Sequence, residues 1–132
     1  DIYDLKIRAD KINAYLEEEG LEDVIMTFNR VVNLADKSNR KEVREDLLIE
    51  EAEIGLYKAF NSIEEEVLHS LKKKEYDKAL DKFMALKEPV DNFFDKVMVM
   101  VEDEDIRENR LGLLAKISET MLLICDLSKL IK

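Results

Sequence analysis

The sequence predicts an all-α protein, a single bundle of five to six antiparallel helices. Apolar residues recur every three to four positions along most of the chain, which is the helical period. Only 3 Gly and 1 Pro occur among 132 residues, too few for an all-β domain rich in turns. The chain is long enough to bury one core and shows no internal repeat or linker. Residues 1–132 are therefore expected to form one domain.

The first half of the chain predicts three helices. Residues 2–18 carry apolar side chains at helical spacing and stop before Gly20, which favours a helix end. Residues 21–37 have one apolar side and an opposite side of amides and cations, as in an amphipathic helix. Residues 36–46 show little periodicity and predict a loop, after which a long helix is expected over 49–71.

The second half predicts three more helical segments. A helix over 76–86 is followed by one that begins near Pro89, because proline is well tolerated in a first helical turn. The five apolar residues 97–101 fit either a buried strand or a buried helix end. Since a lone strand would lack a partner, we expect a helix end. The last helix, over 103–131, is apolar on two sides and is expected to be central.

Composition and charge exclude several classes of function. The chain carries 21 basic and 31 acidic residues, a net charge of −10, which makes nonspecific binding to DNA or to a membrane surface unfavourable. No apolar run approaches the roughly 20 residues that span a bilayer. One cysteine cannot form an internal disulfide, which favours a reducing, cytoplasmic compartment. The first residue is Asp1, so we expect a piece of a longer protein.

Nothing in the sequence predicts catalysis, a metal or a cofactor in this chain. Glu66 and His69 have the spacing of two metal ligands on one helical face, but a di-metal bundle needs that motif twice and the chain has one histidine. There is no glycine-rich phosphate loop and no nucleophile with a neighbouring base. A stand-alone enzyme is therefore not expected.

Two polar groups are not explained by packing alone. Arg107, Asn109 and Arg110 form a dense donor cluster near the start of the last helix, where cations are unfavourable for the helix dipole. Asp91 and Asp95 are four residues apart and share one face of the preceding helix. Either the two carboxylates pair with the arginines inside the domain, or a ligand with phosphates does; the two interpretations are compatible.

Several motifs resemble the end of the β subunit of bacterial glycyl-tRNA synthetases. PVDNFFDKVMVM (89–100), an acidic spacer and RENRLGLL (107–114) form the most specific block, and DLSKL (126–130) resembles the family's final motif. FNRVVNLA (28–35) is similar to a family helix that usually has lysine at the position of Asn29, so one positive charge is missing here. The resemblance covers roughly residues 8–131.

The resemblance implies a tRNA-binding function for this chain. The family is an α2β2 enzyme whose α subunit uses glycine and ATP, while the β subunit holds the tRNA and ends in an all-helical domain similar to the anticodon-binding domain of arginyl-tRNA synthetases. The implied partners are glycine tRNA and the remaining α and β polypeptide. A helical protein–protein module that supports its neighbours without touching RNA fits the composition equally well, and only the motifs argue against it.

The residues expected to contact tRNA follow from the chemistry of an anticodon loop. Unstacked bases are read by planar groups, amides and cations, and glycine anticodons end in two cytosines. Arg30, Asn33 and Lys37 share the polar side of the helix over 21–37 and are the first candidates. The cluster at 107–110 is the second, with the carboxylates of the preceding helix orienting its arginines.

Overall fold

The computed structural model describes residues 21–39 and 42–128, so the predicted helix over 2–18 lies outside the described residues. No strand occurs among the described residues, and the all-helical class is confirmed. The elements, in chain order, are α3 (Leu21–Ala35), the 3-10 helix η1 (Glu45–Leu47), α4 (Glu51–Lys72), α5 (Tyr76–Met84), α6 (Lys87–Lys96) and α7 (Glu104–Ser128).

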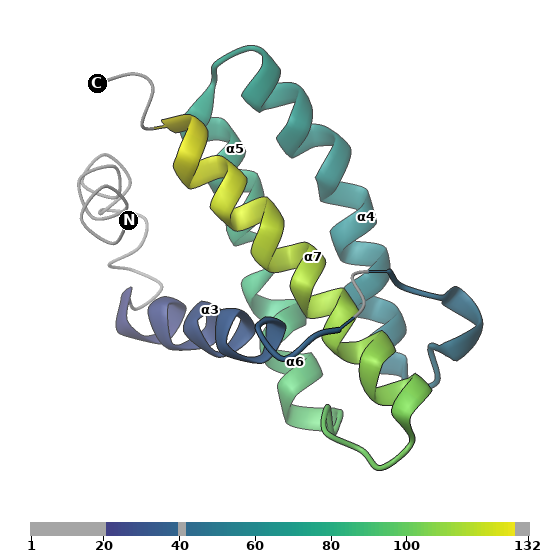
Figure 1. Cartoon of the computed structure of the whole chain (residues 1–132). Coiled ribbons are helices and arrows are strands. Elements are labelled where there is room, and N and C mark those ends of the chain that lie inside the picture. The colour runs from purple at the N-terminus through teal and green to yellow at the C-terminus, as the bar shows by residue number, and fades with distance from the viewer. Residues whose placement is uncertain (1–20, 40–41, 129–132) are drawn as a thin grey trace.

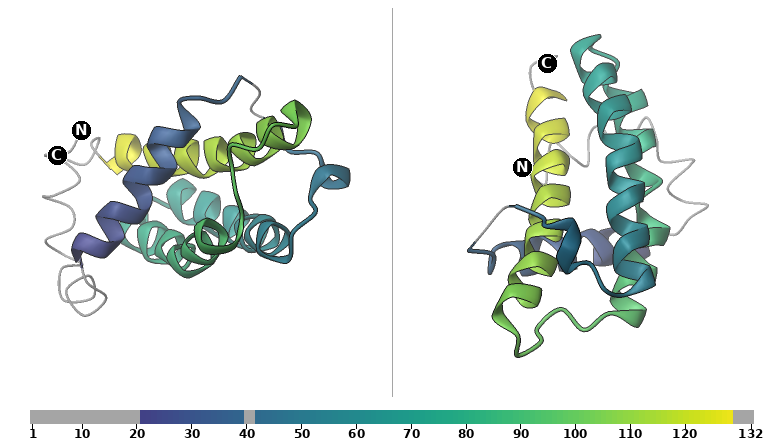
Figure 2. Two further views of the ribbon diagram at one scale, coloured as in Figure 1. Left: turned by 90° about the horizontal axis from the view of Figure 1, so that it is seen from below. Right: turned by 90° about the vertical axis from the view of Figure 1, so that its right-hand side faces the viewer.

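Three rods of helix form the body of the domain. α4 and α7 run in the same direction, and α5 followed by α6 returns in the opposite direction (Figure 1). α3 lies across one end of these rods, packed against α7 and α6 (Figure 1; Figure 2). One side of α3 is therefore covered by the bundle while the other faces outward.

The core is built from the apolar stripes that predicted the helices. Leu56 and Phe60 of α4 and Phe83 of α5 are fully or almost fully buried. Phe28 joins α3 to this core, with its ring centroid 5.3 Å from that of Phe83. Residues 108–115 of α7 are all buried, and α7 packs against α3, α4, α5 and η1. The prediction that the last helix is central is confirmed.

The prediction of a buried helix end over residues 97–101 is wrong. α6 ends at Lys96, and Val97 has φ −120° and ψ 128°, an extended backbone. Val97 and Val99 are 6% and 7% exposed, whereas Met98 and Met100 are 72% and 49% exposed. This alternation is the period of two of an extended chain. The missing partner strand is replaced in part by a side chain, because Arg110 donates a hydrogen bond to the Met98 carbonyl at 2.7 Å.

A buried ion pair joins α4 to α7. The Arg110 Nε atom lies 3.1 Å from Glu53 Oε2, and its Nη2 lies 3.4 Å from Oε1. The side chains of Arg110 and Glu53 are 6% and 0% exposed. Glu53 Oε1 also accepts the backbone N–H groups of Ile49 and Glu50, which precede α4. The carboxylate partner expected for Arg110, Asp91 or Asp95, was wrong, and Glu53 takes that position.

The turn between α4 and α5 requires a left-handed residue. Lys74 has φ 63°, and the N–H groups of Lys74 and Glu75 donate to the carbonyls of Leu71 and Ser70. These two bonds form a Schellman motif, in which glycine is the usual residue because a Cβ atom is unfavourable there. The lysine at this position therefore stores backbone strain.

Replacing Arg110 with alanine is expected to lower the free energy of unfolding by about 3–5 kcal/mol, because the Glu53 carboxylate would remain buried without its cation. Urea denaturation measures this loss. Arg44→Ala is the control: it removes an exposed pair with Asp46 and should cost at most about 1 kcal/mol. An Arg110→Ala protein that unfolds at the parental urea concentration would contradict the structural role of the pair.

Lys74→Gly is expected to stabilise the domain by roughly 0.5–1 kcal/mol, since relief of the left-handed strain outweighs the added entropy of the unfolded chain. Lys73, with φ −84° and ψ 1°, is the matched position where glycine brings no such relief. Thermal melts of the two variants compare them, and a Lys74→Gly midpoint at or below that of Lys73→Gly would refute the strain.

Candidate nucleic-acid interface

The exposed side of α3 carries the first group of predicted site residues. Arg30 and Asn33 are exposed on this side, while Val24 and Val31 pack into the core. Lys37 is also exposed but lies beyond the end of α3, in a turn closed by its N–H and the Leu34 carbonyl at 3.0 Å. The prediction that Lys37 continues the same helix face was therefore wrong, because α3 ends at Ala35, two residues before it.

Arg30 stacks on an aromatic ring that the sequence did not assign to it. Its guanidinium carbon lies 4.2 Å from the ring centroid of Phe94 on α6. Phe94 in turn meets the buried Phe93 edge to face, with centroids 5.7 Å apart. Adjacent helical residues point about 100° apart, so one of two consecutive phenylalanines must lie off the core face. That pattern was the available signal for Phe94.

A groove of about 910 Å³ lies between α3 and residues 94–100. The Arg30–Phe94 stack forms part of its wall, and Lys96 contributes a second cation. We call it the methionine groove because Met26, Met98 and Met100 line it. Its polar and aromatic lining residues are Asn29, Arg30, Asn33, Phe94, Asp95 and Lys96.

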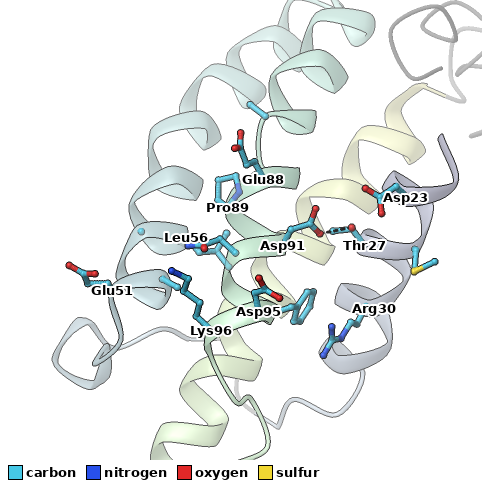
Figure 3. Close-up of a pocket in the computed structure, with 16 residues that line it drawn as sticks. Asp23, Thr27, Arg30, Glu51, Leu56, Glu88, Pro89, Asp91, Asp95 and Lys96 are labelled. Atoms are coloured by element: carbon cyan, nitrogen blue, oxygen red, sulfur yellow. Dashed lines mark hydrogen bonds between the residues drawn. The ribbon is translucent and has the colours of Figure 1, made fainter. Parts of the chain in front are cut away.

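A second opening, of about 980 Å³, lies on the other side of the same stack, between α3, α4 and α6 (Figure 3). Both openings are lined by Met26, Arg30, Phe94, Asp95 and Lys96. Five carboxylates line the second opening, which makes it unfavourable for phosphates. They are Asp23, Glu51, Glu88, Asp91 and Asp95. A polyanion is therefore expected to approach from the methionine groove and not from this side.

Asp91 positions α3, and its predicted role of orienting arginines is wrong. Its carboxylate accepts a hydrogen bond from the Thr27 hydroxyl at 2.6 Å (Figure 3). It accepts another from Lys87 Nζ at 2.7 Å. Lys87 also pairs with Asp23 of α3 at 2.7 Å. The hydrogen bonds that Lys87 donates to the carboxylates of Asp23 and Asp91 raise the pKa of Lys87 above its ordinary value, so the lysine stays charged. Asp95 lines the second opening and forms no ion pair with an arginine in the described part of the chain.

In the second group of predicted site residues, Asn109 and Arg110 are buried and Arg107 is partly exposed. Arg110 is held by Glu53, and Asn109 is 4% exposed. The Asn109 amide accepts the Arg44 N–H at 2.6 Å and donates to the Arg44 carbonyl at 3.1 Å. Half-buried Arg107 donates to the Val101 carbonyl at 3.3 Å. These side chains hold neighbouring segments in place. Cations near a helix start are unfavourable, and here hydrogen-bond partners within the domain stabilise them.

Loop residues between α3 and α4 are fastened to the start of α7. The buried carboxylate of Glu108 accepts the Asn39 N–H at 2.9 Å, and Asn109 clamps the backbone of Arg44. The backbones of Asn39 and Arg44 are therefore held beside the start of α7. Arg44 itself directs its guanidinium to Asp46 at 2.8 Å, with both side chains more than half exposed.

No group of three or more metal-ligating side chains gathers among residues 21–39 and 42–128. None of the helices in that part of the chain is both long and apolar enough to cross a bilayer.

Comparison with known proteins identifies the family to which this domain is similar. Residues 24–127 match the model of the DALR anticodon binding domain. The chain is 47% identical over 131 residues to the glycine–tRNA ligase beta subunit of Clostridioides difficile (strain 630), which covers 99% of this chain and 19% of that relative. Identity is 42% over 132 residues with the beta subunit of Sulfurihydrogenibium sp. (strain YO3AOP1), at 99% and 20% coverage.

The beta subunit of Syntrophomonas wolfei is 35% identical over 131 residues, again at 99% and 19% coverage. The chain thus spans about a fifth of the length of these curated relatives. The family match extends from within α3 almost to the end of α7 and so includes every helix that forms the bundle. The chain belongs to the DALR anticodon binding domain family.

Proposed function

We propose that this domain binds the anticodon region of glycine tRNA as the C-terminal part of the β subunit of a glycine–tRNA ligase. The observation that carries the proposal is the outward-facing Arg30–Phe94 stack beside Asn33, in a chain of an anticodon-binding family. The high identity to glycine–tRNA ligase beta subunits supports glycine as the amino acid.

The geometry suits recognition of a single-stranded loop. An unpaired base needs a flat surface to stack on and polar groups that read its edge. The guanidinium of Arg30 offers such a plane, and its central carbon lies 4.2 Å from the ring centroid of Phe94. The exposed amide of Asn33 can accept a hydrogen bond from the amino group of a cytosine and can donate one to its carbonyl or ring nitrogen. Lys37, just beyond α3, is placed to meet a phosphate.

Chemistry is proposed to take place elsewhere in the enzyme. Glycine and ATP would bind the α subunit of an α2β2 assembly in the cytoplasm, and no cofactor is assigned to this domain. The net charge of −10 opposes strong binding of RNA by the domain alone. Attachment to the remainder of the enzyme would raise the effective concentration of the anticodon loop, so the domain would contribute discrimination more than affinity.

A helical module that only supports neighbouring parts of the enzyme is the alternative. The exposed Leu68 of α4 and Leu122 and Leu123 of α7 are the apolar side chains such a module would use. They lie on other elements than the Arg30–Phe94 stack, so substitutions on α3 discriminate between the two functions.

Arg30→Ala and Asn33→Ala, made in the whole ligase, are each expected to reduce glycine tRNA charging about tenfold. A base-edge contact contributes about 1–3 kcal/mol in duplex readout, and a similar value is expected here. Glycine activation, measured by pyrophosphate exchange, should remain unchanged because it needs no tRNA contact from this domain.

Lys72→Ala provides the matched control, since it removes an exposed cation from the last residue of α4, at the opposite end of the bundle from α3 (Figure 1). It should charge normally. If the α3 variants lowered charging of wild-type and anticodon-substituted tRNA by equal factors, these residues would not read the anticodon and the supporting-module alternative would gain.

A further inference from the structure

Three exposed methionines gather at one place on the surface. The chain has 5 methionines, of which Met84 and Met121 pack against the core. Met26, Met98 and Met100 are 69%, 72% and 49% exposed, and all three line the methionine groove. Exposed apolar side chains are ordinary when scattered, but their convergence on a single groove indicates a binding surface.

The groove has a fixed shape on both sides. Val97 and Val99 anchor the extended segment in the core, so Met98 and Met100 must project outward. On the opposite side Met26 and Arg30 are one turn apart on α3, which Asp91 and Lys87 hold against α6. The thioethers and the Arg30–Phe94 plane therefore face a common space.

The charges of the groove differ from those of the whole chain. Arg30 and Lys96 outnumber Asp95 as charged lining residues, although the chain carries a net −10. Apolar walls beside a planar guanidinium and a lysine suit a ligand with a flat uncharged face and an adjoining negative charge. An unstacked nucleotide has both, the base for stacking and the phosphate for the cation.

Resting on the proposed function, we propose that the methionine groove holds one unpaired base of the anticodon loop. The base lies against the Met98 thioether and the Arg30 plane, and Lys96 pairs with a neighbouring phosphate. Residues 96–100 thereby contribute to binding of the anticodon loop in addition to α3. Thioethers are polarizable and adapt their shape, so Met98 can pack against the flat face of any base. The hydrogen bonds that distinguish one base from another are left to Asn33.

A coupling cycle in the whole ligase tests this assignment. Charging efficiency is measured for wild-type and Met98→Ala enzymes with normal glycine tRNA and with three tRNAs, each abasic at one anticodon position. With normal tRNA, Met98→Ala is expected to reduce charging about five- to tenfold. With one of the abasic tRNAs it should cause no further reduction, because the base it contacts is already absent.

Ile49→Ala is the control for loss of an exposed apolar side chain, and it should charge every tRNA normally. Met98 is 72% exposed, so its truncation should leave the thermal midpoint unchanged. Lys96→Ala should reduce the slope of log binding constant against log salt concentration by about 1, the value for one lost phosphate contact.

Equal reductions by Met98→Ala for all four tRNAs, or no reduction for any of them, would overturn the groove assignment. The proposed function is judged separately by Arg30→Ala in the same four tRNAs. If Arg30 couples to an anticodon position while Met98 does not, the domain reads the anticodon without the groove. If neither residue couples to any position, both proposals fail.

Discussion

The pair between Glu53 and Arg110 is the constraint on which the other features of this domain depend. Two opposite charges are withdrawn from water, which is tolerable only when their hydrogen bonds are satisfied. Glu53 accepts hydrogen bonds from Arg110 and from the backbone just before α4. Arg110 also donates a hydrogen bond to the Met98 carbonyl. No buried side-chain nitrogen or oxygen within the described residues lacks a hydrogen-bond partner. One pair therefore sets the positions of α4, α7 and the extended segment after α6.

Helical periodicity predicted most of the fold because the buried side of each helix can be recognised from the spacing of apolar residues within that helix. It also indicated that α7 is central, since the apolar residues from Leu113 to Leu130 fall on two sides of the predicted helix. It failed at 97–101, where a short apolar run carries no period and the decisive hydrogen bond comes from Arg110. Glu53 offered an overlooked signal. It stands in the same helical register as Leu56 and Phe60, and an acid on a buried face requires a cation from elsewhere in the chain.

The candidate site was predictable only where one helix supplies it. Arg30 and Asn33 could be recognised because α3 has a single apolar side and they lie on the other. The groove required knowledge that α6 brings Phe94 beneath Arg30, a contact between residues 64 positions apart. The donors at 109 and 110 misled for the opposite reason: their partners, the Arg44 backbone and Glu53, are distant in sequence. A cluster of polar residues identifies a need for partners, but not where those partners lie.

The hydrogen bond from Arg110 to the Met98 carbonyl also has a kinetic and entropic consequence. It holds residues 97–101 in their extended path before any ligand arrives, so a ligand of the groove does not have to order a flexible segment. Ordering costs of that kind otherwise subtract from affinity. Association would then be set by diffusion and by charge repulsion from the acidic body, while the lifetime of the complex would depend on the contacts in the groove. Loosening that one bond would weaken binding without removing a single side chain that touches the ligand.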